Sequence, residues 1–506
     1  MIKYCQQLTS FEMLKKYTII GAGPSGLAAG LELSKHNGQV VIFDKNEVVG
    51  GLARTHRHKG YSFDVGPHRF YTKNSEVLAL WKEILKDEFI EVDRLTRIYY
   101  KNRLFQYPIQ FNDLLKTLTP WEIAKISSSY LFASIFYRFQ EPKTFEDWIV
   151  KNFGRTLYEM FFKTYTEKVW GIPCDQIGAE WAAQRIKNLN FFEAARNALS
   201  KNRNKNNKVK SLVEKFYYPR HGAGQMHEVM AERIQKSGGK IHLKSRIKKI
   251  NHHNFTRVDN IVVTDENNKP KTVPVDYLLS SMPITEFIDC LEPAPSKKII
   301  NASKALYYRD HITVNLVINR ANLFKDNWIY VHSPEVKMAR VANYNNFSKD
   351  MLANKNSSAI SVEYFVFQKD QLWQMKDKDI IKLAIDELIK MNLLKKKEHV
   401  VSGFVIRETE SYPTYYMGHQ EHFDVIKNFV KKFENVELIG RGGQYKYNNM
   451  DHAVYSGLLA AKKMLGTSNL DPWAVNEDAE YLEEKRQEQK KNINVTVPLT
   501  HELAQS

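Results

Sequence analysis

Cysteine is scarce in this chain, and the scarcity argues against two kinds of protein. The 506 residues include three cysteines, Cys5, Cys174 and Cys290. An odd, widely spaced set provides neither a disulfide framework nor a cysteine-rich metal site. The histidines form no His-Glu-x-x-His pattern, so we expect no bound metal. Few thiols suit a reducing compartment, and we expect the protein in the cytoplasm.

Long apolar runs are also missing. The amino terminus lacks the apolar region of a secretion signal. The longest apolar run, Tyr130–Phe139, is far too short to cross a bilayer. We expect this run to form a buried helix, with a helix lying on a membrane surface as the alternative.

The chain has a surplus of positive charge. Lysine and arginine number 74, against 57 aspartates and glutamates, so the formal net charge is +17. Such a surplus attracts anions, including phosphate-bearing substrates and acidic lipids. Part of it lies in Ser200–Lys210, which is typical of a solvated basic loop. No nucleic-acid motif accompanies it. We expect a small-molecule substrate and no nucleic-acid partner. A peripheral contact with a membrane is an alternative that the function does not require.

A glycine-rich turn near the amino terminus is the strongest motif. An apolar strand, Tyr17–Ile20, runs into Gly21-Ala22-Gly23-Pro24-Ser25-Gly26, and a helix follows. This is the dinucleotide-binding fingerprint in its proper context, with the helix N-terminus facing the phosphates at Pro24 and Ser25. Gly21 makes the tight turn, and Gly23 lets the backbone approach a pyrophosphate. Gly26 allows the helix to pack closely on the strand.

The residues after this helix indicate which dinucleotide is bound. A second strand, Val40–Phe43, ends at Asp44, 18 residues after Gly26, where a carboxylate can accept from ribose hydroxyls. Here the chain resembles the flavin amine-oxidase superfamily, in which a glycine pair and an arginine lie beside the diphosphate and the flavin. The resemblance implies FAD, and it rests on Gly50, Gly51, Leu52 and Arg54.

Three later segments carry the same resemblance. Phe216–Ile250 has a glycine turn, a helix and a strand, and relatives use that strand, here near Ile247, to contact the adenine side of FAD. Asp276–Phe287 resembles the strand that re-enters the cofactor domain. Asn435–Leu465 resembles the returning segment whose helix points at the flavin. The resemblance places Arg441, Tyr447 and Met450 at the cofactor.

We therefore expect an α/β fold, with a discontinuous Rossmann-type FAD-binding domain, a helical cap and an antiparallel-sheet substrate domain. The chain is long enough for several cores. The amino-terminal residues before the first strand are expected to form a loose leader, with Met13 as an alternative start. The expected bounds are 17–75, 215–285 and 401–466 for the FAD domain, 76–214 for the cap, 286–400 for the sheet domain, and 477–506 for a charged, disordered tail.

Within the superfamily, the chain resembles the UDP-galactopyranose mutases and the protoporphyrinogen oxidases. The mutase flavin loop Gly-Pro-His-Ile-Phe-His-Thr corresponds to 66–72, where His68 matches and Tyr71 replaces the second histidine. The resemblance also assigns five candidate substrate-site residues: Tyr165, Trp170, Arg340, Tyr412 and Tyr447. Two mutase positions differ, because Leu189 replaces a second arginine and Asn449 replaces an aspartate.

These patterns leave three functions open. The first is an FAD-dependent oxidoreductase with redox chemistry at flavin N5, acting on a sugar nucleotide or another glycan precursor, with oxygen or NAD(P)H as the electron partner. The second is a mutase-like isomerase that uses reduced FAD. The third is a non-catalytic, flavin-stabilised scaffold at a membrane surface. Because Leu189 and Asn449 depart from the mutase pattern, we favour the oxidoreductase.

Overall fold

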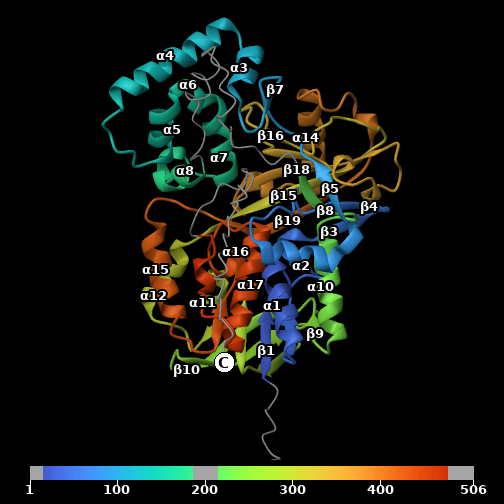
Figure 1. The fold of residues 1–506 in the computed structure, drawn as a ribbon, viewed down its shortest axis with the longest axis vertical. Coiled ribbons are helices and arrows are strands. Elements are labelled where there is room, and N and C mark those ends of the chain that lie inside the picture. The colour runs from blue at the N-terminus through green and yellow to red at the C-terminus, as the bar shows by residue number, and fades with distance from the viewer. Residues whose placement is uncertain (1–14, 186–214, 477–506) are drawn as a thin grey trace, which may run out of the picture.

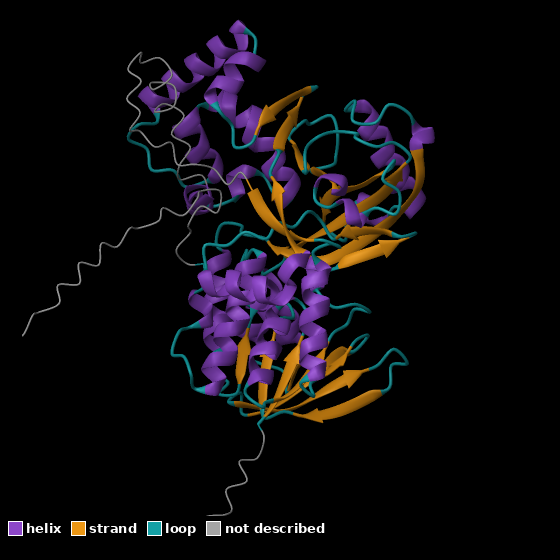
Figure 2. Cartoon of the chain, turned by 45° about the vertical axis from the view of Figure 1, so that its right-hand side comes forward, coloured by secondary structure: helices purple, strands orange, loops and turns teal. Residues whose placement is uncertain are grey.

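The computed structural model describes residues 15–185 and 215–476. The expected leader, the basic loop, Leu189 and the charged tail lie outside these residues. Figures 1 and 2 show a helix-covered parallel sheet at one end of the molecule, and a second sheet beside a group of helices at the other. Among the described residues, no helix is both long and apolar enough to cross a membrane.

A five-stranded parallel sheet forms the base of the molecule, in the order β20-β13-β1-β2-β9. β1 occupies the centre, and the chain departs from it in both directions, which makes its carboxyl end a topological switch point where ligands bind. Apolar residues such as Ile19 and Ile42 are fully buried because helices cover the sheet. The strands are β1 (Lys16–Ile20), β2 (Gln39–Phe43), β9 (Lys240–His242), β13 (Tyr277–Ser280) and β20 (Val436–Leu438).

Helices from three distant parts of the chain pack on this sheet. α1 lies between α10 and α17. The α1–α17 contact is very close, since a Cβ on Gly457 would lie 2.1 Å from the Ser25 carbonyl oxygen. The helices are α1 (Pro24–Lys35), α2 (Ser75–Leu85), α10 (Gly224–Lys236), α16 (Gly440–Gly443) and α17 (Met450–Leu465).

A four-stranded sheet, β12-β11-β10-β14, forms a satellite of the base. Its apolar face shares a core with Ile20 and Phe43 of the parallel sheet. The elements are β10 (Arg246–His253), β11 (Arg257–Thr264), β12 (Pro270–Pro274), β14 (Leu291–Glu292), α11 (Ile284–Asp289), α12 (Lys297–Ala305) and α15 (His419–Val430).

A seven-stranded, mostly antiparallel sheet lies above the base, in the order β19-β15-β18-β17-β16-β6-β7. Every residue of β15 and β18 is buried. The members are β6 (Thr96–Tyr100), β7 (Arg103–Gln106), β15 (Tyr308–Ile318), β16 (Trp328–Val331), β17 (Arg340–Asn343), β18 (Ser358–Val366), β19 (Val400–Pro413), and the helices α13 (Gln371–Gln374) and α14 (Asp377–Lys390) beside them.

This sheet differs from the expected segment bounds. β6 and β7 come from the segment 76–214, which we expected to be a helical cap, and β19 comes from a segment assigned to the FAD domain. β19 pairs with β15 along its whole length, so it belongs to the upper sheet while its end reaches the base. Two small antiparallel pairs complete the strands: β3 (Thr55–His58) with β4 (Tyr61–Asp64), and β5 (Phe89–Asp93) with β8 (Lys215–Pro219).

The remaining helices form a group beside the upper sheet. The expected buried helix at Tyr130–Phe139 is wrong, because Phe132, Ile135, Phe136 and Phe139 are exposed. The helix packs on its neighbours through small residues such as Ala133, which leaves its large side chains outside. The helices are α3 (Phe111–Thr117), α4 (Pro120–Phe136), α5 (Phe145–Phe153), α6 (Arg155–Leu157), a π-helical turn (Tyr158–Lys163), α7 (Thr164–Trp170) and α8 (Ala179–Arg185).

We predict that Gly457→Ala lowers the free energy of unfolding by about 1–3 kcal/mol, because the new methyl group meets the backbone of α1. Without that contact, alanine would stabilise a helix by roughly 0.5–1 kcal/mol. Urea unfolding followed by tryptophan fluorescence measures the change. Gln235→Ala, on the exposed face of α10, is the control and should leave stability nearly unchanged. A Gly457→Ala protein more stable than the wild type would contradict the close approach.

Candidate FAD site

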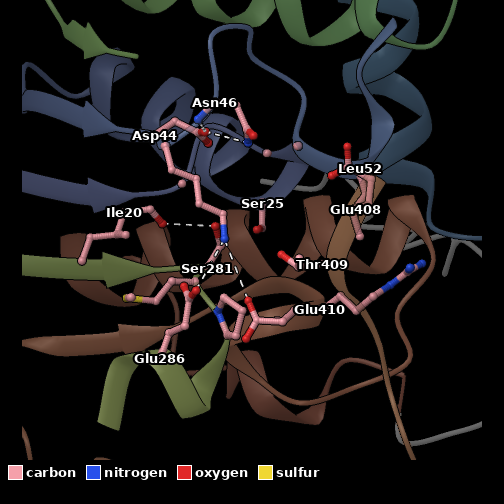
Figure 3. A pocket seen from close by; sticks show the side chains of 18 of the residues that line it. Ile20, Ser25, Asp44, Asn46, Leu52, Ser281, Glu286, Glu408, Thr409 and Glu410 are labelled. Carbon is pink, nitrogen blue, oxygen red and sulfur yellow. Dashed lines mark hydrogen bonds and ion pairs between the residues drawn. The ribbon is translucent and has the colours of Figure 1, made fainter. Parts of the chain in front are cut away.

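A cavity of about 790 Å³ opens at the carboxyl edge of the parallel sheet. This volume lies within the roughly 300–1,000 Å³ typical of ligand and cofactor sites. Figure 3 shows that its walls come from both sheets, with Ile20, Ser25 and Asp44 on the base side and Glu408, Thr409 and Glu410 on β19.

The glycine-rich turn forms one wall of the cavity. Gly21 has φ +99°, and a Cβ there would lie 2.1 Å from Ser281 Oγ, so only glycine fits. Gly23 is the N-cap residue of α1, and no side chain caps the helix. Gly23, Pro24 and Ser25 all line the cavity. The free backbone N–H groups of the first turn are therefore suited to an anionic diphosphate.

Asp44 holds the turn and borders the cavity. Its Oδ2 accepts from the backbone N–H of Ala22 at 2.6 Å, and its Oδ1 accepts from the backbone N–H of Asn46 at 2.7 Å. Figure 3 shows the bonds between Asp44 and Asn46 at the cavity wall. A carboxylate has about four acceptor positions. Asp44 therefore retains acceptor capacity for ribose hydroxyls after it has fixed the turn.

Arg54 joins the base of the cavity to β19. Its Nη1 donates to the Gly51 carbonyl at 2.7 Å, and its Nη2 is ion-paired with Glu408. Its Nε donates to His56 Nε2 at 3.1 Å, so that nitrogen must carry a lone pair. Burial and Arg54 lower the pKa of His56 to about 4. Arg54 thus positions the glycine pair against β19.

Apolar groups line the other end of the cavity. Ile247, Met282 and Pro283 lie there, from β10 and from the segment after β13. Such flat and branched surfaces suit an adenine ring. Ile247 therefore lines the cavity.

Three charged residues at the cavity wall had not been predicted. Lys45 Nζ lies 3.5 Å from Glu286 and 3.9 Å from Glu410. Burial and the neighbouring Glu286 raise the pKa of Glu410 to about 8. Glu410 is therefore largely protonated at neutral pH, which limits the negative charge that the pair brings to the cavity.

Arg441 links two segments at the inner end of the cavity. Its Nε and Nη2 donate to the Asn448 carbonyl at 3.0 and 2.8 Å, and its Nη1 donates to the Ser411 carbonyl at 3.1 Å. The guanidinium lies 4.6 Å from the Tyr412 ring centre and 5.4 Å from that of Tyr447. Arg441 therefore orients both tyrosines while it borders the cavity.

His68 faces the cavity beside Arg441. Its Nδ1 lies 2.9 Å from the Gly66 carbonyl, and a carbonyl can only accept, so Nδ1 carries the proton and Nε2 carries the lone pair. Burial, together with the guanidiniums of Arg340 and Arg441, lowers the pKa of His68 to about 3. The side chain is consequently a neutral hydrogen-bond acceptor at physiological pH.

The predicted substrate residues form an aromatic cluster beyond Arg441. Tyr412 and Tyr447 stack with ring centres 5.6 Å apart, and Trp170 lies 5.7 Å from Tyr447. Tyr165 stacks on His332 at 4.6 Å. The structure thus brings together residues from four distant segments. None of Tyr165, Trp170, Arg340, Tyr412 and Tyr447 lines the main cavity, and neither do Gly26 and Gly50, which shape the turns behind it.

Arg340 is paired with a buried carboxylate. Its Nε and Nη2 both donate to Glu363, the second at 2.7 Å, and Glu363 is 1% exposed. A Cβ on Gly66 would lie 2.5 Å from Glu363 Oε1. The pair therefore packs directly beneath the His68 loop, and the charge of Arg340 is matched within the protein.

Sequence reasoning missed Glu363, Glu408 and His311. His311 Nδ1 lies 2.7 Å from Ser411 Oγ, and burial, Arg340 and Arg441 lower its pKa to about 3. Glu363 is the one acidic or basic residue of the wholly buried strand β18, and that was the available signal. Glu408 and His311 have charged neighbours in β19 and β15, so nothing in the sequence set them apart. Among the described residues, no group of three or more metal-ligating side chains is placed to hold an ion.

Comparisons with known proteins identify the family. The model of the flavin-containing amine oxidoreductases matches residues 24–465. A Klebsiella pneumoniae protein named "Probable UDP-galactopyranose mutase" is 30% identical over 173 residues, which cover 33% of this chain and 43% of that protein. A 1-hydroxycarotenoid 3,4-desaturase of Flavobacterium sp. is 24% identical over 290 residues, which cover 54% of this chain and 57% of that protein. The matches thus span about half the length of these relatives.

A solved structure extends the fold comparison to nearly the whole chain. A reduced UDP-galactopyranose mutase superposes with a TM-score of 0.77 at 19% identity, covering 91% of this chain and 97% of that one. At this identity the likeness concerns the fold alone. The predicted α/β fold with a flavin-binding domain and a separate antiparallel sheet is therefore confirmed.

We predict that the protein loses stability steeply as the pH falls from 7 to 5. Five histidines have folded-state pKa values near 3 or 4, well below the roughly 6.5 of an unfolded chain. The unfolded state therefore binds more protons below pH 6.5, and each histidine costs up to about 1.4 kcal/mol per pH unit. They are His56, His68, His227, His311 and His332.

Buried carboxyls act in the opposite direction. Burial raises the pKa of Asp64 to about 6, so acid stabilises that group in the folded state, as it does Glu410. Burial also raises the pKa of Asp289, Asp310, Glu408 and Glu437. The pKa shifts of the five histidines are larger than those of these four carboxyls, so the net effect is a loss of stability. Urea unfolding at pH 7, 6 and 5 measures it. His227→Leu should reduce the proton uptake by about one, whereas a pH-independent wild type would contradict the neutral histidines.

Proposed function

Because the chain belongs to the flavin-containing amine oxidoreductases, we propose that it is an FAD-dependent oxidoreductase acting on a hydroxyl-bearing small molecule beside His68. The family establishes that the protein is a flavoenzyme with FAD as its cofactor. The substrate and the direction of the chemistry are the proposal, with a sugar nucleotide or another glycan precursor as the substrate class.

The cavity residues fit FAD. The uncapped N-terminus of α1 would hold the diphosphate, Asp44 would accept from the ribose, and Ile247 would cover the adenine. Ser281 packs against the glycine-rich turn, and Arg54 holds the glycine pair beside the cofactor site. When bound, FAD supplies an acceptor for a hydride, which carries the electron pair of the broken C–H bond.

The proposal rests on the charges of the inner site, where the buried arginine has a carboxylate partner and the nearby histidines are neutral. Arg340 is paired with Glu363, and His68 and His311 are neutral. A diphosphate-binding arginine needs donors that are free to bind both phosphates, but Arg340 spends its Nε and Nη2 on Glu363. Shape and hydrogen bonding, rather than a free cation, thus favour an uncharged reacting group.

His68 supplies the hydrogen bond that orients this group. The lone pair on Nε2 accepts from a substrate hydroxyl, while the bond from Nδ1 to the Gly66 carbonyl fixes the ring. The accepted O–H thereby sets the orientation of the adjacent C–H bond. Tyr412 and Tyr447, which stack on each other beyond Arg441, would limit the space on that side of the substrate.

A mutase-like isomerase is the second candidate. The 30% identity to the Klebsiella mutase and the mutase fold support it. His68, Tyr165, Trp170, Arg340, Tyr412 and Tyr447 lie close to one another, as the mutase resemblance implies. Against it stand the Arg340–Glu363 pair and Asn449, which caps α17 instead of providing a carboxylate.

One experiment separates the two candidates. Oxidised holoprotein is mixed anaerobically with UDP-glucose or UDP-galactopyranose, and loss of the visible FAD absorbance is followed; dithionite-reduced holoprotein with UDP-galactopyranose is analysed for a ring-contracted product. We expect the flavin to be reduced and no ring-contracted product to form. The Arg340→Ala substitution should change the affinity for UDP by less than about threefold. Ring contraction without net flavin reduction, together with a loss of about 2 kcal/mol or more of UDP binding in Arg340→Ala, would establish the mutase instead.

A substitution of His68 tests its role directly. We predict that His68→Ala slows flavin reduction by at least about 100-fold while FAD stays bound, because a positioned acceptor is lost. Since the pKa of His68 is about 3, the wild-type rate should show no titration of this residue between pH 5 and 8. His253→Ala, at an exposed histidine, is the control. Unchanged flavin reduction in His68→Ala would remove His68 from the mechanism.

A further inference from the structure

An apolar surface lies exposed at the tip of the helical group, around α4 at the top of Figure 1. Trp121 is 78% exposed, Ile135 66% and Phe139 91%. Isolated exposed apolar residues are ordinary, but a contiguous set on one helix marks an interaction surface. We call this set the α4 surface; it consists of Trp121, Leu131, Phe132, Ile135, Phe136 and Phe139.

Phe132, Ile135 and Phe136 form the contiguous part of the α4 surface; Trp121 lies near the start of α4, and Phe139 lies three residues beyond its end. Residues three and four apart are neighbours on a helix, which places Phe132 next to Ile135 and Phe136. The rings of Phe132 and Phe136 stack with centres 4.2 Å apart. The helix is anchored from its opposite face, where a Cβ on Gly154 would lie 2.8 Å from the Tyr130 backbone nitrogen. In α4, only Ala133 is buried.

The charges within the segment that carries this surface are mostly positive. Between Leu115 and Phe139 the charged residues are Lys116, Glu122, Lys125 and Arg138. The carboxylate of Glu122 is paired with Arg103 at 2.7 Å, whereas the three cations are exposed. The Arg138 guanidinium lies 5.7 Å from the Phe139 ring centre, so cation and ring are presented together. The surface thus combines apolar anchors with a positive rim.

We propose that the α4 surface docks into the interfacial layer of a membrane that contains acidic lipids. α4 has 17 residues, and at about 1.5 Å per residue it is roughly 26 Å long, so it would lie along the membrane plane. Its aromatic and aliphatic side chains would enter the boundary between headgroups and acyl chains. Lys116, Lys125 and Arg138 would meet the anionic headgroups.

Charge favours this occupant over a second copy of the chain. In a symmetric dimer through the α4 surface, the same patch meets itself. Lys116, Lys125 and Arg138 of one copy would then lie near those of the other, and like charges repel. An acidic lipid surface instead complements all three cations, and the net charge of +17 adds a long-range attraction in the same direction.

The test uses co-sedimentation of the full-length holoprotein with phosphatidylcholine vesicles that contain or lack phosphatidylglycerol. The apolar variant carries Phe132→Ser, Ile135→Ser and Phe139→Ser; the cation variant carries Lys116→Gln, Lys125→Gln and Arg138→Gln. The matched control replaces three exposed apolar residues elsewhere: Val401→Ser, Met417→Ser and Leu470→Ser. FAD absorbance and thermal unfolding confirm that each variant is folded.

We expect the wild type and the control to bind vesicles containing phosphatidylglycerol. The apolar variant should bind at least about tenfold more weakly, and the cation variant should lose a similar factor that high salt also removes from the wild type. Equal binding by the apolar variant and the wild type would overturn the proposal. A different result would assign the surface to a second copy of the chain: the wild type does not bind vesicles and sediments as a dimer, whereas the apolar variant sediments as a monomer.

Discussion

The close approach of the backbone to itself where β1 runs into α1 is the constraint on which the cofactor site depends. Gly21 and Gly26 leave no room for a Cβ there, and Gly457 brings a helix from the far end of the chain onto the same turn. Asp44 and Ser281 then hold the turn from the two neighbouring strands. The uncapped start of α1 is consequently fixed at the switch point of the sheet, where the cavity opens.

Charge is matched around the inner end of that cavity. Arg54 is paired with Glu408, Arg340 with Glu363, and Arg441 with two backbone carbonyls. Burial keeps the nearby histidines neutral, and these cations add to the effect because they repel a second positive charge. The site is therefore rigid and preorganised, with its polar groups oriented before any ligand arrives.

Local sequence patterns, together with the resemblance to the flavin amine oxidases, located much of the cavity. The glycine turn, Asp44, Arg54, Ile247 and Arg441 each lie in a recognisable segment, and the structure places all of them at the cavity wall. Their roles toward FAD remain predictions. Glu363, Glu408 and His311 could not be assigned in this way, because a buried ionisable residue gains its meaning from a partner far away in the chain.

Dependence on distant parts of the chain also explains why the expected segment bounds and the expected burial of α4 differ from the structure. Whether β6 and β7 extend a sheet depends on β16, which lies more than two hundred residues further along. Helical periodicity identified α4 as a helix, but burial depends on whether another element covers its outer face, and the segment itself does not encode that. Periodicity predicts the element, and tertiary packing decides its environment.

The order of strands in the parallel sheet has a consequence for biosynthesis. The central strand β1 emerges from the ribosome first, yet its neighbour β13 and the edge strand β20 are made only after residues 277 and 436, respectively. Arg441 and Met450, which line the cavity, come later still. The glycine turn must therefore wait for more than four hundred further residues, and FAD can find its complete binding site only after Met450 has been made.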